Sequence, residues 1–200
     1  LFRSRILEKW DGNTLICSKL YYRHRPDRIF GMGGLFDRKT GKKRLIGRNE
    51  LDKPEYQKDR EVDWFLGIGV MIHKSIVDKV GYLDEKDFPH YHADADYSLR
   101  AVNRGYKNVV FHQLMLLNDT ETTGISHKKN KSFKDFFNSL ISIKSSLNIK
   151  RNLKFYHRHT TSAIAYLFLL RTYFIYAGSF TKWKVLGWFG KRRQEYRELL

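Results

Sequence analysis

The stretch EVDWFLGIGVMIHKSIVDKVGYLDEKDFPHYHADADYSLRAVNRGY, residues 61–106, decides the fold that we expect for this chain. Its first part, Val62 to Ile72, is apolar and is interrupted by Gly67 and Gly69. A short apolar run with turn-forming glycines favours a buried strand, or two strands joined by a turn. We therefore expect residues 62–72 to enter the core of a sheet.

Two helices are predicted after this apolar run in the sequence. The spacing of apolar side chains predicts a short helix over residues 75–80 and a second helix over residues 97–104. Gly105 is suited to end the second helix, because glycine accepts the left-handed conformation that often follows a helix. An acidic cluster, Asp94-Ala95-Asp96, stands directly before this second helix.

Strands are predicted on both sides of residues 61–106. Residues 14–22 have the composition of a strand, and residues 107–117 are expected to add strands to the same sheet. The segment between residues 23 and 56 contains the turn signal Lys39-Thr40-Gly41-Lys42 and is expected to be a loop-rich hairpin region. Residues 118–124 are polar and indicate a loop. Alternating strands and helices predict an α/β fold.

The basic charge is concentrated at the C-terminal end. The 200 residues carry a formal net charge of +17. Residues 1–126 contain 22 basic and 18 acidic side chains, whereas residues 127–200 contain 16 basic and 3 acidic ones. A strongly basic segment with many aromatic side chains indicates an anionic partner, such as an acidic lipid, a polyanion or a nucleic acid.

The single cysteine, Cys17, excludes an intramolecular disulfide and suits a reducing compartment. Residues 1–9 have the pattern of the end of a helix and are too charged for a signal peptide. Because residue 1 is Leu, we expect the chain to be a piece of a longer protein.

Three consecutive stretches carry a family resemblance. They are VDWFLGIGVMIHK at 62–74, VGYLDEKDF at 80–88 and ADADYSLRAVNRGY at 93–106, preceded by PDRIFGMGG at 26–34 and followed by Arg151-Asn152 and FYHRH at 155–159. In this order and spacing they resemble the acceptor half of family-2 glycosyltransferases of the GT-A fold, of the rhamnosyltransferase-like kind. The resemblance covers most of residues 15–160 and is strongest over residues 61–106.

The resemblance implies a partial GT-A, Rossmann-like mixed sheet with flanking helices, followed by a basic helical tail. Residues 1–126 would form the acceptor-side half of the domain, and residues 127–200 a basic, amphipathic helical region. The half of the family that binds the sugar nucleotide has no counterpart here, so this chain is expected to lack most of the donor site and to be inactive alone. The implied activity is inverting transfer of a sugar from a nucleotide-sugar donor to a cell-surface polysaccharide or a lipid-linked glycan.

The resemblance also implies roles for two carboxylates. Asp94 matches the catalytic base, which must lie within about 3 Å of the acceptor hydroxyl in a productive complex. Asp96 matches the second acidic residue, which helps to order the site, and we group both as catalytic. Ala93 stands where the family has Glu, so a neighbour of the base is missing. The structural alternative is that Asp94 and Asp96 only cap the helix that follows.

Four further residues are predicted to bind the acceptor. Trp64 beside Gly67 could form a stacking wall for a sugar ring, although a core tryptophan at a strand end is an equally good interpretation. Asp63 is expected at the same rim, and so is His92. An alternative for His92, together with His90 and Asp94, is a zinc site.

A divalent cation, Mg²⁺ or Mn²⁺, is expected from the resemblance, with most of its ligands in the missing half. The position of the family's late histidine ligand is occupied by Asn118. Its amide oxygen could serve a hard cation, but a simple turn at this position is the alternative.

The basic tail allows several interpretations. Residues 160–177 approach the roughly 18–20 residues of a bilayer span but contain Arg171. Trp183, Trp188 and the flanking lysines and arginines favour helices lying on an anionic membrane surface, with a peripheral location on the cytoplasmic face. Ordinary water-exposed helices are a third interpretation, and nucleic acid is not expected as a partner. The alternative function is a non-catalytic membrane-binding or polyanion-binding module left from a truncated glycosyltransferase.

Overall fold

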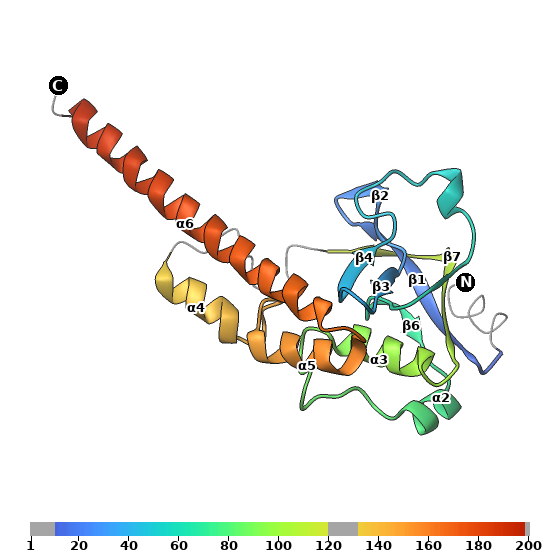
Figure 1. Cartoon of the computed structure of the whole chain (residues 1–200). Helices are drawn as coiled ribbons and strands as arrows, with labels where there is room; N and C mark the ends of the chain where they lie inside the picture. The colour runs from blue at the N-terminus through green and yellow to red at the C-terminus, as the bar shows by residue number, and fades with distance from the viewer. Residues whose placement is uncertain (1–10, 120–131, 199–200) are drawn as a thin grey trace.

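The computed structural model describes residues 11–119 and 132–198, with side chains up to residue 186. The predicted helix of residues 1–9, most of the predicted loop of residues 118–124 and the side chain of Trp188 lie outside the described residues. The described part is an α/β structure with one curled mixed sheet, a separate hairpin and five α-helices (Figure 1).

The main sheet is built around two long parallel strands. Its path is β2-β1-β7-β5, and β6 pairs with β1 outside this path. The strands are β1 (Thr14–Tyr22), β2 (Arg25–Gly31), β5 (Arg60–Val62), β6 (Val70–Met71) and β7 (Lys107–Asn118). β1 and β7 are parallel, with Thr14 opposite Lys107 and Tyr22 opposite Asn118, whereas the other pairs are antiparallel. The predicted strands at residues 14–22 and 107–117 are thus confirmed.

A hairpin of two short strands forms the second sheet. It consists of β3 (Gly34–Asp37) and β4 (Lys42–Leu45). Its turn contains Gly41 with a positive φ of 70°, a conformation that glycine adopts without steric cost. The side chain of Asp37 accepts hydrogen bonds from the backbone of Lys39 and from the Thr40 hydroxyl, which closes the turn.

The helices lie along one side of the sheet and then extend away from it (Figure 1). They are α2 (Lys74–Val80), α3 (Ala93–Val102), α4 (Phe133–Ile141), α5 (Ile149–His159) and α6 (Ile164–Glu198), with a short 3-10 turn, η1 (Pro54–Tyr56). The first turns of α4 and α5 are capped by the side chains of Ser132 and Asn148. α6 runs outward as one long helix beyond α4.

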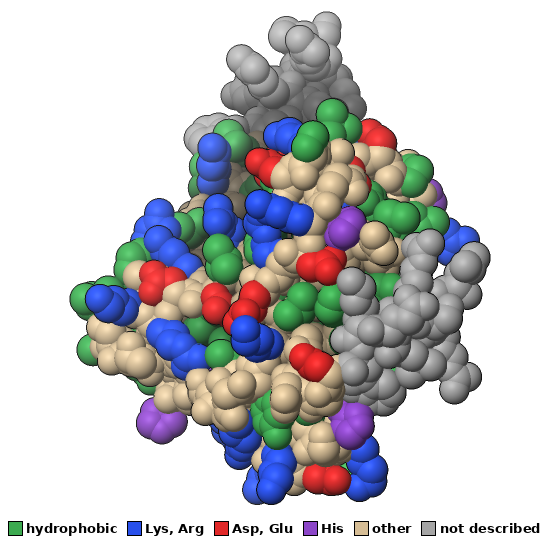
Figure 2. Space-filling view, turned by 90° about the vertical axis from the view of Figure 1, so that its right-hand side faces the viewer, with side chains coloured by type: hydrophobic (Ala, Val, Ile, Leu, Met, Phe, Trp, Pro, Cys, Tyr) green, Lys and Arg blue, Asp and Glu red, His purple; other side chains and the backbone are tan. Residues whose placement is uncertain are grey.

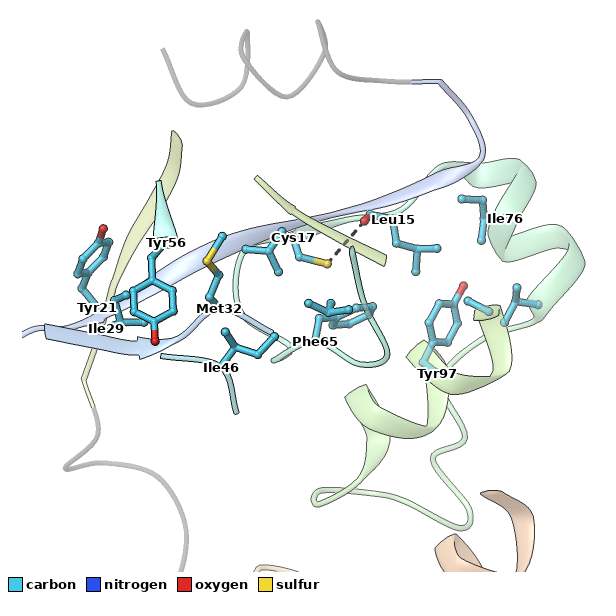
Figure 3. Packing of buried hydrophobic residues seen from close by; sticks show 14 residues of the cluster. Leu15, Cys17, Tyr21, Ile29, Met32, Ile46, Tyr56, Phe65, Ile76 and Tyr97 are labelled. Carbon is cyan, nitrogen blue, oxygen red and sulfur yellow. Dashed lines mark hydrogen bonds between the residues drawn. The ribbon is translucent and has the colours of Figure 1, made fainter. Parts of the chain in front are cut away.

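The core contains three apolar clusters, of which two pack against the helices. The larger one lies between the sheet and helices α2 and α3, and Figure 3 shows its members packed together, with the Cys17 thiol donating to the carbonyl of Leu15. The second cluster lies between the hairpin, α3 and α5 and contains Phe36, Trp64, Phe88, Ala95, Leu99 and Phe155. Because Phe155 of α5 is fully buried in it, part of the C-terminal region belongs to the same core as residues before 126.

Two element predictions were inexact. Residues 62–72 do not form one continuous strand, and the alternative of two strands joined by a turn is closer: β5 ends at Val62, and an irregular loop leads to the two-residue β6. The helix predicted to begin at residue 97 begins at Ala93, so Asp94 and Asp96 lie in its first turn rather than before it. Its N-cap is His92, which has a positive φ of 74° and makes no capping hydrogen bond with its side chain.

Charge is mixed on the face of the body that points away from the tip of α6. On that face, Lys and Arg side chains alternate with Asp and Glu side chains (Figure 2).

Among the helices of the described residues, none has both the length and the apolar content needed to cross a bilayer. The transmembrane alternative for residues 160–177 therefore has no support in the structure.

Gly34 is predicted to be required for packing against Trp64. A Cβ atom at Gly34 would lie 2.4 Å from Cε2 and Nε1 of the Trp64 indole. Gly34→Ala should therefore lower the free energy of unfolding in urea by roughly 1–3 kcal/mol, the usual cost of overpacking.

Gly178→Ala is the matched control, because Gly178 lies in α6 and a Cβ atom there would meet nothing within 4 Å. This change should raise stability by roughly 0.5–1 kcal/mol through helix propensity. Equal effects of the two substitutions would contradict the packing argument.

Candidate functional site

The candidate site forms where the loop after Trp64 is tied to the start of α3. The backbone N–H of Phe65 donates to Ser98 Oγ over 3.2 Å, and the N–H of Gly67 donates to Asp94 Oδ2 over 3.1 Å. Ser98 in turn donates to the carbonyl oxygen of Asp94. These bonds join two segments of the sequence that carry the resemblance.

Asp94 lies half-buried at this junction. Its second carboxylate oxygen, Oδ1, accepts from the N–H of Ala95 over 2.8 Å. A negative charge in the first turn of a helix is stabilised by the unpaired N–H groups and the helix dipole. Because Asp94 also binds Gly67 in the facing loop, it does more than cap α3.

Lys43 of β4 brings a cation to the same place. Although the residue as a whole is exposed, its ammonium group lies 4.6 Å from the ring centroid of Phe155 and 5.6 Å from that of Trp64. Burial of the ammonium group lowers the pKa of Lys43 to about 8, against the opposing effect of the nearby Asp94 charge. The site therefore holds one carboxylate and one lysine of unusually low basicity.

His92 connects Lys43 to the C-terminal helices. Its Nδ1 lies 2.8 Å from Lys43 Nζ, and its Nε2 lies 2.6 Å from Asn152 Oδ1. Its ring stacks on Phe155 with centroids 4.5 Å apart. Burial, and next the charge of Lys43, lower the pKa of His92 to about 3, so the imidazole is neutral. A neutral ring that accepts from Lys43 at Nδ1 donates to Asn152 from Nε2.

The chain of hydrogen bonds continues beyond Asn152. The Asn152 amide group donates to the hydroxyl of Tyr173 in α6 over 2.8 Å and to the carbonyl of Ser146. A continuous polar path thus runs from β4 through the start of α3 and α5 to α6.

Asp96 is fully buried and is surrounded by two arginines and a histidine. Its carboxylate accepts from Arg100 Nε at 2.8 Å and from Arg158 Nη1 at 2.9 Å, and it lies 2.8 Å from His159 Nε2. Burial alone would raise the pKa of Asp96, but the hydrogen bonds from His159, Arg100 and Arg158 outweigh it and hold the pKa below its ordinary value. Asp96 therefore joins α3 to α5 and has no open side for an acceptor.

Three basic residues of α5 contact the segment between α2 and α3. Arg151 donates to the carbonyls of Lys86 and Asp87. Arg158 pairs with Asp84 and Asp87 as well as with Asp96, and Lys154 pairs with Asp87. α5 thus fixes the loop that leads into the candidate site.

The other predicted acceptor residues lie nearby but are engaged within the fold. Trp64 is only 7% exposed, and its indole N–H donates to the carbonyl of Leu35, so it fits the core alternative better than a sugar-stacking wall. The Asp63 carboxylate accepts from the N–H of Phe36 over 2.7 Å. Gly67 is exposed beside Asp94, and His92 uses both ring nitrogens as described.

Sequence reasoning missed Lys43 and Tyr173 as parts of this site. Lys43 directly follows the turn signal Lys39-Thr40-Gly41-Lys42, and Tyr173 lies in the apolar stretch of residues 160–177. Asn152 was noted only for its place in the resemblance. No local pattern marks Lys43 or Tyr173, because their partners are distant in the sequence.

The described residues do not fit a divalent-cation site. No group of three or more His, Cys, Asp and Glu side chains within residues 11–119 and 132–198 is arranged to hold a metal ion, which leaves the zinc alternative at His90 and His92 without support. Asn118 ends β7 opposite Tyr22, and its backbone carbonyl accepts from the N–H of Arg23.

No protein-family model matches the chain, and no curated protein sequence matches it.

The lowered pKa of Lys43 is predicted to be measurable and to depend on Asp94. With ¹³C-dimethylated lysines, one NMR signal should titrate near pH 8 and should be absent in Lys43→Arg. In Asp94→Asn this midpoint should move lower still, because the loss of the negative charge removes a contribution that favours the ammonium form. An unchanged midpoint in Asp94→Asn would show that the two groups do not interact.

Asp96→Asn is predicted to destabilise the protein strongly. Removing one partner of a buried ion pair leaves the other charges uncompensated, which costs roughly 3–5 kcal/mol. Denaturant unfolding at neutral pH measures this loss, with Asp27→Asn, 62% exposed in its side chain, as the surface control.

The same variant has a predictable pH dependence. Because the pKa of Asp96 is lowered in the folded state, its contribution is complete above about pH 5 and is lost as the pH falls through the folded pKa. The stability difference between wild type and Asp96→Asn should therefore be constant at higher pH and should narrow in acid. A difference that grew in acid would contradict this assignment.

Proposed function

We propose that this chain forms the acceptor-side half of an inverting glycosyltransferase and that Asp94 is its general base. The observation that carries the proposal is the position of Asp94. Its half-buried carboxylate accepts from the backbone N–H of Ala95 at the start of α3 and from that of the exposed Gly67 in the facing loop. A fixed and accessible carboxylate is what proton removal from an incoming hydroxyl requires.

The proposed reaction is a single displacement. The acceptor hydroxyl oxygen attacks the anomeric carbon of the donor sugar and gives its proton to Asp94. The bond from the anomeric carbon to the nucleotide diphosphate breaks, and the diphosphate leaves with the bonding electrons. Because the hydroxyl attacks from the face opposite the leaving diphosphate, this single displacement inverts the configuration at the anomeric carbon. The acceptor in this proposal is a hydroxyl of a cell-surface polysaccharide or of a lipid-linked glycan.

The neighbours of Asp94 have distinct tasks in this proposal. Lys43 supplies a positive charge close to the carboxylate, and His92 positions Lys43 through its Nδ1. Asp96 is a positioning residue, because it is enclosed by Arg100, Arg158 and His159 and acts by holding α5 against α3. The nucleotide-sugar donor and any Mg²⁺ or Mn²⁺ would be bound mainly by residues outside this chain, so no step is assigned to a metal.

A second candidate is a non-catalytic module that binds polyanions or membranes. It is favoured by Ala93, which replaces the acidic neighbour of the base, and by the exposed cations Lys42 and Arg44 beside the site. Binding of an anionic polysaccharide that is equally strong in wild type and in Asp94→Asn, without any sugar transfer, would support this candidate instead.

The test of the proposed function is Asp94→Asn in the full-length protein that carries this chain. Transfer from a panel of labelled nucleotide sugars to membrane-derived acceptors should fall about 100- to 10,000-fold, the usual contribution of a general base. Donor affinity, measured by calorimetry, should stay unchanged.

Asp78→Asn is the matched control, because Asp78 is exposed on α2 and pairs only with the neighbouring Lys74 in the contacts described. It should keep wild-type turnover. Turnover of Asp94→Asn equal to that of Asp78→Asn would remove Asp94 from the mechanism.

A further inference from the structure

α6 uses one of its faces to pack on α4 and α5. Ala165, Leu169 and Phe180 are buried on this face. Tyr176 stacks on Phe136 of α4 with ring centroids 5.0 Å apart, and its hydroxyl lies 2.6 Å from Ser139 Oγ. On this side, the apolar side chains of α6 are therefore already covered by α4 and α5.

Other parts of the α6 surface are also apolar, but they are exposed. Five large apolar side chains are between 51% and 68% exposed there: Ile164, Leu167, Leu170, Phe174 and Ile175. A helix that is hydrophobic on all sides is normally buried on all sides. We therefore expect the exposed apolar side chains of α6 to contact a further apolar environment.

α4 adds a second exposed apolar stripe. Phe133, Phe137 and Ile141 follow each other at intervals of four residues and are 63%, 60% and 72% exposed. An apolar groove of about 230 Å³ opens between the helices, lined among others by Phe136, Leu170 and Phe174. Exposed apolar surface of this kind marks a contact with a partner or a membrane.

The charges around this surface are almost all positive. Lys134, Lys144, Lys150, Arg171, Lys182 and Lys184 are exposed on or beside α4 and α6. Asp135 is the only acidic residue between 132 and 186, and its carboxylate accepts from Ser132 in the cap of α4. Lys184 lies 5.2 Å from the ring centroid of Phe133, so a cation stands at the end of the aromatic stripe.

We propose that the exposed faces of α4 and α6 form a binding surface for an anionic lipid bilayer. The aromatic and aliphatic side chains enter the boundary between headgroups and acyl chains, while the lysines and Arg171 bind lipid phosphates. Trp183 is 73% exposed between two lysines, a position suited to the interfacial region. A second copy of the chain is a poorer occupant, because it would bring two strongly basic surfaces together.

This proposal does not rest on the sugar-transfer proposal. It concerns α4 and α6 and uses neither Asp94 nor Lys43. Vesicle binding can therefore succeed or fail independently of enzyme activity.

The experiment is flotation of the whole chain with phosphatidylcholine vesicles and with vesicles that also contain phosphatidylglycerol. The chain should float with the anionic vesicles and much less with the neutral ones. Raising the salt concentration should weaken binding, because salt screens the attraction to lipid phosphates. Binding that is equal for both vesicle types, or absent from both, overturns the proposal.

Two sets of variants assign the surface. Phe137→Ser with Ile141→Ser removes part of the apolar stripe, and Lys182→Gln with Lys184→Gln removes two cations. Each pair should weaken binding to anionic vesicles about tenfold or more, which corresponds to roughly 1.4 kcal/mol. Leu51→Ser with Leu83→Ser is the control, because these side chains are 49% and 52% exposed on the body. It should bind as wild type does.

Two further outcomes decide against the proposal. Stripe variants that bind as strongly as wild type would show that another surface is used. A lipid-independent dimer of the wild type in light scattering that the stripe variants abolish would identify a second copy as the occupant. Unchanged circular dichroism and unfolding midpoints ensure that each variant is folded.

Discussion

The buried carboxylate of Asp96 is the constraint on which the arrangement of the helices depends. A carboxylate with no exposed surface is costly unless it is paired and hydrogen-bonded. Arg100 supplies one partner from α3 itself, but Arg158 and His159 come from α5, more than sixty residues later. α5 must therefore lie against α3. This contact also buries Phe155 beside Phe88 and Leu99, so the ionic and apolar requirements favour the same packing.

The position of Asp94 follows from that contact. It lies two residues before Asp96 in the same helical turn, so fixing one fixes the backbone of the other. His92 begins the helix in a left-handed conformation, which is uncommon for residues other than glycine. The stacking of its ring on Phe155 and its hydrogen bond to Asn152 stabilise that conformation. α5 thus determines where α3 starts and which way its first carboxylate faces.

The sequence predicted the features that depend on local pattern and not those that depend on distant contacts. The strands at 14–22 and 107–118 and the helix at 74–80 follow from apolar runs and nearby turn signals. The start of α3 was placed four residues late, because aspartates often precede helices, whereas here α5 stabilises the extra turn. Trp64 is buried because Gly34 leaves room for its indole. Lys43 joins the site through partners on α3 and α5, which no local pattern in its hairpin reveals.

The C-terminal helices α5 and α6 have different roles, and Tyr173 of α6 connects them. α5 is part of the core, whereas α6 presents apolar side chains outward. Tyr173 lines the apolar groove, yet its hydroxyl accepts from Asn152, which binds His92 and through it Lys43. Each of these three hydrogen-bond distances is below 3 Å, so the bonds leave little room for displacement of the residues. A shift of α6 along α5 would have to break one of these bonds or move His92. The groove between the C-terminal helices is therefore joined by hydrogen bonds to Lys43, whose ammonium group feels the charge of the carboxylate proposed to act on a sugar hydroxyl.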